Sequence, residues 1–191
     1  YLINAVLLKV FAKVNPIKFF KKILPAQIVA FSTQSSAGTL PVATEILTDK
    51  IGVSGKVANV TTPLGTTIGM PGCAGIWPIL VSLYGIYGLG INFSLTDYIT
   101  LVVVALFVSF GTAGVPGTAT VTTASVLTVM GLPLELIVLT IPISALADTG
   151  RTATNITGAM VSATIVARQE DSLDDEIFEK EDEEENKAVT A

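Results

Sequence analysis

The feature that most constrains this chain is a long region without basic residues that Gly and Pro interrupt repeatedly. Residues 57–150 contain no Lys or Arg, and their only acidic residues are Asp97, Glu135 and Asp148. Half of the 191 residues are hydrophobic, the mean hydropathy is +0.67 and only 14% are charged, whereas about a quarter of a soluble domain is charged. This composition predicts a protein embedded in a lipid bilayer.

Four apolar stretches can be distinguished, and each contains a cluster of Gly, Pro, Ser or Thr near its middle. The clusters are FSTQSSAGTLP (31–41), GMPGCAG (69–75), GTAGVPGTA (111–119) and ADTGRTATN (147–155). A backbone break exposed to lipid would leave N–H and C=O groups without partners, so such breaks survive only where protein or a cavity surrounds them. Four breaks in four stretches therefore predict discontinuous helices around a site near the middle of the bilayer.

We predict an all-α integral membrane fold, an inverted repeat in which each half pairs a re-entrant helical hairpin with an interrupted transmembrane helix. The Lys-rich segment 9–22 and Arg168 mark the cytoplasmic side. Because both marks should lie on one side, two stretches should cross the membrane and two should enter and return. The expected segments are residues 1–22, the end of a transmembrane helix and a basic cytoplasmic linker; residues 23–167, the core, with a hairpin at about 23–47, a broken helix at about 55–90, a second hairpin at about 97–131 and a last helix at about 133–167; and residues 168–191, an acidic disordered cytoplasmic tail. We expect a multi-pass protein of the cell membrane with its C-terminus in the cytoplasm.

The two ends of the chain differ in character from the core. Eleven of the 16 acidic residues lie in residues 169–191, and such a block of like charge is typically disordered and solvated; a docking segment for a partner is the alternative. The first residues, YLINAVLLKVFAK, resemble the end of an apolar helix and not a signal peptide. We therefore expect further membrane segments upstream.

The stretch SALADTGRTATNITGAM (144–160) contains the strongest candidate for a binding site. Asp148, Arg151, Thr152 and Asn155 are three, one and three residues apart, which places them along one face of a helix. Charges at membrane depth face the protein interior or a cavity. One interpretation is a self-satisfied Asp148–Arg151 ion pair that only holds the helix. The other is recognition of a zwitterionic amino acid, in which a carboxylate binds the ammonium group, a guanidinium binds a carboxylate, and Asn155 donates to one group and accepts from the other.

The other broken regions have expected roles around such a site. TQSSAGTLP (33–41) and GTAGVPGTA (111–119) suit hairpin tips whose backbone N–H groups bind a carboxylate, although small residues also serve close helix packing. The break GTTIGMPGCAG (65–75) would leave carbonyl groups that can coordinate a cation. Four further residues are assigned to packing or to an interfacial belt and not to ligand binding: Cys73, Trp77, Tyr84 and Tyr87.

Several classes of function find no support in the sequence. The chain has no His and a single cysteine, which excludes an internal disulfide and leaves a zinc site without its usual ligands. It contains no nucleophile elbow and no phosphate-binding loop with its Lys, so we do not predict an enzyme. It has no basic patch for nucleic acid. No cofactor is expected apart from a coupling ion, H⁺ or Na⁺.

Four of these motifs, in this order, resemble the dicarboxylate/amino acid:cation symporter family, the glutamate-transporter-like proteins, over nearly all of residues 15–168. SSAGTLPV (35–42) is similar to the family's first re-entrant hairpin, PLGTTIGMPG (63–72) to its interrupted seventh helix, GTAGVPG (111–117) to its second hairpin and DTGRTATNITG (148–158) to its eighth helix. The resemblance implies an elevator-type secondary transporter, usually a homotrimer, in which this C-terminal half carries the substrate against an N-terminal scaffold.

The resemblance also implies a substrate site. Asp148 would bind the amino group of the substrate, and Arg151 would bind its side-chain carboxylate. The residues that would complete the pocket are Thr152 and Asn155, with backbone from Ser36, Val115 and Gly117 around the main carboxylate.

The sequence departs from the family pattern where sodium is expected to bind. Pro71 and Ala159 stand where the family has carboxylates of two sodium sites. Because a hard cation without an anionic oxygen ligand is held weakly, we expect both sites to be absent. A third sodium site could persist, with ligands that include Thr67, Ser109 and Thr112. Gln34 stands where an Arg is common.

The same departures bear on the substrate. GCAG (72–75), together with the missing Asp at position 159, is similar to the L-cystine uptake branch of the family, often described as proton-linked. We predict a symporter for L-cystine; the alternative is a sodium-coupled symporter for acidic amino acids or C4-dicarboxylates. From a different class, the chain could be a membrane-embedded sensor or structural subunit whose acidic tail docks a partner.

Overall fold

The computed structural model describes residues 1–110, 112 and 114–180, and its only β-structure in this part of the chain is an isolated bridge between Val53 and Leu173. The helices are α1 (Leu2–Leu7), η1 (Leu8–Ala12), α2 (Pro16–Lys22), α3 (Leu24–Thr33), α4 (Ser36–Ile46), η2 (Leu47–Ile51), α5 (Gly55–Ile68), η3 (Pro71–Ile76), α6 (Trp77–Gly88), α7 (Leu95–Ser109), α8 (Thr118–Val129), α9 (Glu135–Gln169) and α10 (Asp175–Glu179). The prediction of an all-helical fold is confirmed for the described residues.

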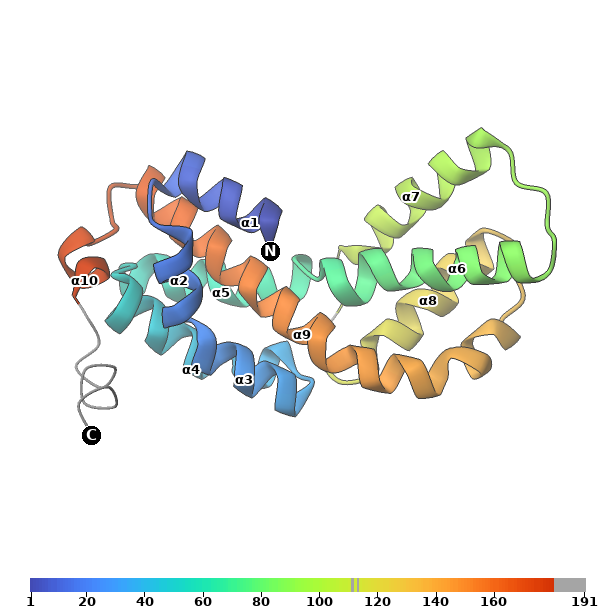
Figure 1. The fold of residues 1–191 in the computed structure, drawn as a ribbon, viewed down its shortest axis with the longest axis horizontal. Coiled ribbons are helices and arrows are strands. Elements are labelled where there is room, and N and C mark those ends of the chain that lie inside the picture. The colour runs from blue at the N-terminus through green and yellow to red at the C-terminus, as the bar shows by residue number, and fades with distance from the viewer. Residues whose placement is uncertain (111, 113, 181–191) are drawn as a thin grey trace.

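The helices form two groups that lie end to end (Figure 1). One group contains α1 to α5, α10 and the second half of α9, and the other contains α6, α7, α8 and the first half of α9. Each group has its own apolar core, with Phe19 and Ile156 in the first and Leu101 and Leu127 in the second. Helix α9 and the line from α5 through η3 to α6 run through both groups and help to hold them together.

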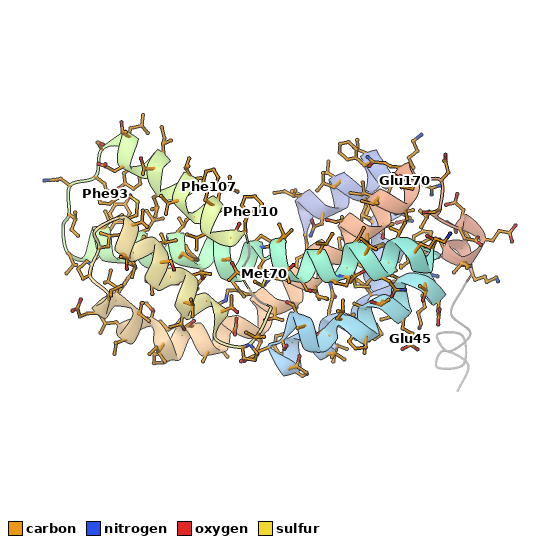
Figure 2. All side chains as sticks on the ribbon, turned by 180° about the vertical axis from the view of Figure 1, so that it is seen from behind. Glu45, Met70, Phe93, Phe107, Phe110 and Glu170 are labelled. Atoms are coloured by element: carbon orange, nitrogen blue, oxygen red, sulfur yellow. The ribbon has the colours of Figure 1, made fainter. Side chains whose placement is uncertain are left out.

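Two helical stretches of the described chain are long and apolar enough to cross a membrane. They are Gly55–Gly88, with 34 residues, and Glu135–Gln169, with 35 residues. At about 1.5 Å per residue a straight helix of this length measures about 50 Å, more than the hydrocarbon core of a bilayer, which is about 30 Å thick. Large apolar side chains cover the outside of the second group; Phe107, for example, is 69% exposed and lies on the outer side of α7 (Figure 2). Such a surface suits contact with lipid or with other membrane segments.

The break in the first of these stretches lies where the sequence predicts it. Gly69 and Met70 leave the helical conformation, with φ/ψ of −98°/58° and −110°/63°, and Pro71 starts η3. Pro71 has no backbone N–H, so it cannot donate the helical hydrogen bond to the carbonyl four residues earlier. Met70 lies between the two groups of helices (Figure 2) and is 2% exposed. The break is therefore buried, as a break at membrane depth must be.

The prediction of a break in the fourth apolar stretch is wrong. Helix α9 is continuous from Glu135 to Gln169, straight through the cluster at 147–155. The cluster contains Gly and Thr but no Pro, so every residue keeps its backbone N–H, and these residues weaken a helix without removing its hydrogen bonds. The hydroxyl of Thr154 also bonds within the helix, to the carbonyl four residues earlier, at 2.9 Å.

The remaining helices of the core form two pairs where the sequence predicts hairpins. Helices α3 and α4 pack together and are joined at Gln34 and Ser35; α7 and α8 pack together and are joined by residues 110–117. At the first connection, Gln34 takes a left-handed conformation with φ of +52°, and the hydroxyl of Ser35 caps α4 by accepting a bond from Gly38 N at 2.9 Å. That each pair enters and leaves the membrane on one side, as halves of an inverted repeat, stays a prediction.

The C-terminal segment differs from the disordered tail expected over residues 168–191. As far as Lys180 it is folded, because Phe178 is 1% exposed in the first core and lies 5.6 Å from the Nζ atoms of both Lys18 and Lys22. Residues 181–191 lie outside the described residues. An apolar residue such as Phe178 within an acidic segment indicates packing against the core, and the charge of the segment alone does not show this.

Candidate substrate-binding site

The two helix connections meet between the two groups of helices. Backbone N–H of Ala37, in the first turn of α4, donates to the carbonyl of Gly114 at 3.0 Å, and the hydroxyl of Ser35 donates to the same carbonyl at 3.3 Å. A Cβ atom on Gly114 would lie 2.6 Å from the carbonyl oxygen of Thr66 and 3.0 Å from Cβ of Ser36. Glycine is therefore required at position 114 for the two connections and α5 to approach this closely.

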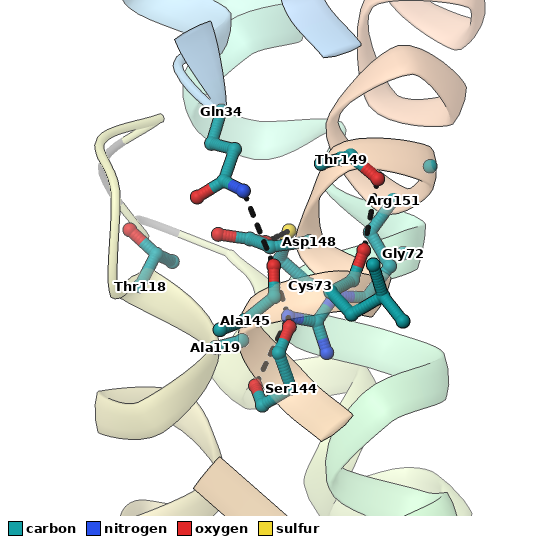
Figure 3. A network of polar contacts seen from close by, with 12 residues as sticks. Gln34, Gly72, Cys73, Thr118, Ala119, Ser144, Ala145, Asp148, Thr149 and Arg151 are labelled. Carbon is teal, nitrogen blue, oxygen red and sulfur yellow. Dashed lines mark hydrogen bonds and ion pairs between the residues drawn. The ribbon is translucent and has the colours of Figure 1, made fainter. Parts of the chain in front are cut away.

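Helix α9 runs beside the two helix connections and there contains two charged residues whose side chains are largely buried, Asp148 and Arg151. Nη2 of Arg151 lies 3.1 Å from Oδ1 of Asp148, and the two side chains are 10% and 11% exposed. The same Nη2 donates to the carbonyl and to the hydroxyl of Ser144, at 2.9 and 3.1 Å. Gln34 joins the first connection to this helix, because its side-chain amide donates to the carbonyl of Ala145 at 3.1 Å (Figure 3).

The Asp148–Arg151 pair exists, but it is not self-satisfied. Nε and Nη1 of Arg151 are buried and have no hydrogen-bond partner among the described residues. The indole ring of Trp77 covers the guanidinium, with its centroid 4.2 Å from Cζ. An unsatisfied buried donor is costly and rare in folded proteins, and at a functional site it points to an absent partner. The open N–H groups of Arg151 suit an anion such as a carboxylate.

Asn155 lies on α9 two turns after Asp148, and its side chain bonds to the broken helix. Its Oδ1 accepts from backbone N–H of Gly72 at 2.8 Å, and its Nδ2 donates to Sγ of Cys73 at 3.2 Å. Cys73 in turn lies with Sγ 3.4 Å from Oδ1 of Asp148. The oxygen of Asn155, expected to accept from a substrate, thus already accepts from Gly72 N–H. One hydrogen of Nδ2 remains that Asn155 can donate to a substrate.

A cavity of about 580 Å³ opens beside Arg151 and Trp77. Its lining is mainly apolar, with Phe31, Ile76 and Leu80 among the residues that line it. The volume falls within the usual range of sites for small molecules, about 300–1,000 Å³. The arrangement therefore offers an apolar space with one charged group at its wall.

The other residues predicted for the pocket are placed less directly. Ser36 is 2% exposed and packs at Gly114, and Thr152 is 2% exposed on α9. Val115 is half exposed, and Gly117 has φ of +86° and precedes the first turn of α8. Within the described residues no side-chain hydrogen bond joins these four residues to Asp148, Arg151 or Asn155, so their role as substrate ligands stays a prediction.

The residues predicted for a sodium site bond to carbonyls nearby in the chain. Thr67 donates to the carbonyl of Leu64 at 3.0 Å, Ser109 to that of Leu106 at 2.6 Å, and Thr112 to that of Val108 at 2.9 Å. In the described part of the chain no group of three or more His, Cys, Asp or Glu side chains could hold a metal ion. The sodium site at these three hydroxyl groups stays a prediction.

The sequence interpretation missed two contributors to this network. It assigned Cys73 to packing, although the thiol contacts both Asp148 and Asn155. It assigned Trp77 to packing or an interfacial belt, although the ring lies against Arg151. Both follow the helix break closely in the sequence, and this position is the one signal that could have marked them.

Broken or paired helices around a buried ion pair, with apolar side chains outside, define a helical membrane protein with an internal polar site. The comparisons with known proteins give the family. The family model for the sodium:dicarboxylate symporter family matches residues 1–169. This chain belongs to that family and is part of a membrane protein.

The relatives give the finer similarity. The chain is 44% identical over 169 residues to an uncharacterized symporter of Haemophilus influenzae, covering 88% of this chain and 38% of the relative. It is 37% identical over 169 residues to the L-cystine uptake protein TcyP of Bacillus thuringiensis, covering 88% and 36%, and 38% identical over 165 residues to that of Shouchella clausii, covering 86% and 35%. The chain thus spans little more than a third of the length of these relatives.

Proposed function

We propose that this chain is the substrate-carrying half of a secondary active amino-acid symporter, and that the substrate is L-cystine. The single observation that carries the proposal is the buried guanidinium of Arg151, whose Nε and Nη1 have no partner among the described residues and which lies beside Asp148. A family of symporters, and not of enzymes, supports transport as the activity.

The charges of the site suit an amino acid. Oδ1 of Asp148 is bonded to Arg151 and Cys73, whereas Oδ2 forms no hydrogen bond within the described residues. Oδ2 would accept from the ammonium group of the substrate, and the unpaired N–H groups of Arg151 would donate to a carboxylate. Thr152 and Asn155 would complete the pocket, with backbone of Ser36, Val115 and Gly117 around the main carboxylate.

L-cystine is favoured over a shorter dicarboxylate because two of the relatives described above are named for L-cystine uptake. The cavity of about 580 Å³ lies beside Arg151, which among the described residues is the one proposed substrate ligand that lines it. Cystine carries a second carboxylate on its far half, which Arg151 would bind as it would bind the side-chain carboxylate of aspartate.

We propose protons as the coupling ion, with sodium at Thr67, Ser109 and Thr112 as the alternative. Pro71 and Ala159 provide no carboxylate where the resemblance places sodium ligands. An elevator mechanism, a homotrimer and an N-terminal scaffold are proposed from the family resemblance. The Lys-rich α2 and the C-terminal α10 lie at one end of the molecule, where Lys18 contacts Glu179 at 2.9 Å, which supports a cytoplasmic location for both.

The central test replaces Arg151 with Lys in the full-length protein and measures uptake into proteoliposomes. Lys keeps the charge but not the planar pair of donors or the stacking on Trp77, so we expect a loss of at least about 10-fold in uptake. Arg168→Lys is the matched control, since Arg168 lies on the same helix at its far end and bonds to Ala12 and Asp175. Equal uptake by the two variants would contradict the proposed role of Arg151.

A second measurement separates substrate and coupling ion. Uptake of labelled L-cystine and of L-aspartate is measured with a sodium gradient and a pH gradient imposed separately. L-cystine uptake driven by the pH gradient and indifferent to sodium is the expected result. Strictly sodium-dependent uptake of L-aspartate would instead favour the alternative, an acidic amino acid symporter.

A further inference from the structure

Cys73 is the side chain that connects the two polar ends of the site. It lies in η3, directly after the helix break, and is 5% exposed. Its Sγ lies 3.4 Å from Oδ1 of Asp148 and 3.2 Å from Nδ2 of Asn155, two residues that are seven positions apart on α9. Its own carbonyl accepts from the hydroxyl of Thr122 on α8 at 3.0 Å, so the backbone of Cys73 is fixed as well.

The directions of these bonds decide which atoms remain for a ligand. A carboxylate only accepts, so the thiol must donate its hydrogen to Asp148; the amide of Asn155 then donates to the sulfur lone pair. Oδ1 of Asp148 is occupied by the thiol and by Arg151, and Oδ2 stays open. Oδ1 of Asn155 is occupied by Gly72, and one N–H of Nδ2 stays open.

A second observation shows that this network faces a missing partner. The side chain of Arg151, bonded to the same Oδ1 of Asp148, is 10% exposed, and its Nε and Nη1 have no partner in the described part of the chain. The thiol of Cys73 is therefore fully bonded within the protein, whereas the network stays incomplete at Arg151, where a ligand would complete it.

We propose that Cys73 is a positioning residue of the substrate site: its thiol holds the Asp148 carboxylate and the Asn155 amide so that Oδ2 and one N–H face the substrate. The inference rests on the proposed function and deepens it, because it assigns a polar role to a residue that sequence patterns place among packing residues. The thiol takes no covalent part. A thiolate would put a second negative charge against Asp148, so the bonded arrangement also keeps the sulfur protonated beside a disulfide substrate.

The test uses two pairs of variants in the full-length protein, each pair nearly equal in shape and different in one hydroxyl group. The pairs are Cys73→Ser with Cys73→Ala, and Cys73→Thr with Cys73→Val. In each pair the first variant can donate to Asp148 and accept from Asn155, and the second can do neither. The apparent KM and the maximal rate of L-cystine uptake are measured in proteoliposomes, with thermal melting of the purified protein as a check of folding. Ser82→Ala is the control, because Ser82 is buried as well but, among the described residues, its hydroxyl bonds only to the carbonyl of Pro78 in its own helix, at 2.8 Å.

We expect the Ala and Val variants to raise the apparent KM by about 10-fold, the size of one lost hydrogen bond to a charged group. The maximal rate should change much less, and the Ser and Thr variants should stay within about threefold of the wild type, as should Ser82→Ala. Equal KM values within both pairs, or a Val variant as good as the wild type, would show that Cys73 only fills space and would overturn the inference. Wild-type protein that takes up no L-cystine would overturn the proposed substrate first, and the inference with it.

Discussion

A close backbone contact between two helices yields a sharp prediction for the substitution Gly65→Ala. Helices α5 and α9 pack together, and a Cβ atom on Gly65 would lie 2.6 Å from Cβ of Ala159 and 2.9 Å from its Cα. Carbon atoms in contact are normally about 3.5–4.0 Å apart. The obstructing atoms belong to the helix itself and not to the end of a flexible side chain, so the two helices must separate by about 1 Å. Overpacking of this kind costs about 1–3 kcal/mol.

The assay is thermal melting of the purified full-length protein in detergent, and we expect a clear decrease in Tm for Gly65→Ala, since a domain of 150–250 residues loses about 2–4 °C per kcal/mol. The matched control is Gly158→Ala, one residue before the contact on α9, where a Cβ would meet no atom within 4 Å. Alanine favours a helix over glycine by up to about 1 kcal/mol, so this variant should be unchanged or more stable. Equal melting temperatures for the two variants would refute the close approach of α5 and α9.

Two further predictions concern the C-terminal segment. Phe178→Ala removes a ring that is 1% exposed, which costs about 3–5 kcal/mol in a core, so α10 should detach and trypsin should cleave faster at Lys18 and Lys22. The control is Phe107→Ala, at a side chain that is 69% exposed, which should leave the cleavage rate unchanged. Equal cleavage rates for the two variants would contradict the packing of α10. Two bonds from the guanidinium of Arg168, at 2.5 and 2.9 Å, lower the pKa of Asp175. A carboxyl group with a lowered pKa stabilises the fold above its unfolded pKa of about 3.9, and this effect is lost as the pH falls through the folded pKa. Asp175→Asn should therefore lower the free energy of unfolding at pH 7 by less than about 1 kcal/mol for this exposed pair, which gives a small decrease in Tm, and the decrease should be smaller at pH 3. A decrease in Tm that does not depend on pH would exclude this ion pair as the cause.

The helix breaks show what local sequence can and cannot predict. The break at Gly69 and Met70 could be predicted from Pro71 and its glycine neighbours together, because Pro71 removes a backbone donor next to residues that weaken a helix. The cluster at 147–155 has the same small and hydroxylated composition but no proline, and there the helix continues. Composition alone does not distinguish the two cases. The loss of a backbone donor is not sufficient either, since α4, α5 and α9 continue through Pro41, Pro63 and Pro142.

The site divides in the same way. Asp148, Arg151 and Asn155 could be predicted together, because a single helix fixes their spacing. The contacts of Cys73 with Asp148 and Asn155 join residues more than 70 positions apart, and no periodicity reports such a distance. Phe178 was missed for a related reason, since its burial depends on α2 and η2, which lie far away in the sequence.

The broken helix and the polar residues of α9 compensate each other. The break at Gly69 and Met70 leaves backbone donors that a continuous helix would satisfy, and Gly72 N–H is satisfied by Asn155 instead. The free end of the thiol at Cys73 is satisfied by Asp148, and Asp148 by Arg151. Each residue in this series thus bonds to the next, and the series ends at Arg151, whose Nε and Nη1 are buried and have no partner among the described residues. A buried cationic donor without a partner is costly, and this is the physical reason to expect an anionic group of the substrate beside Nε and Nη1.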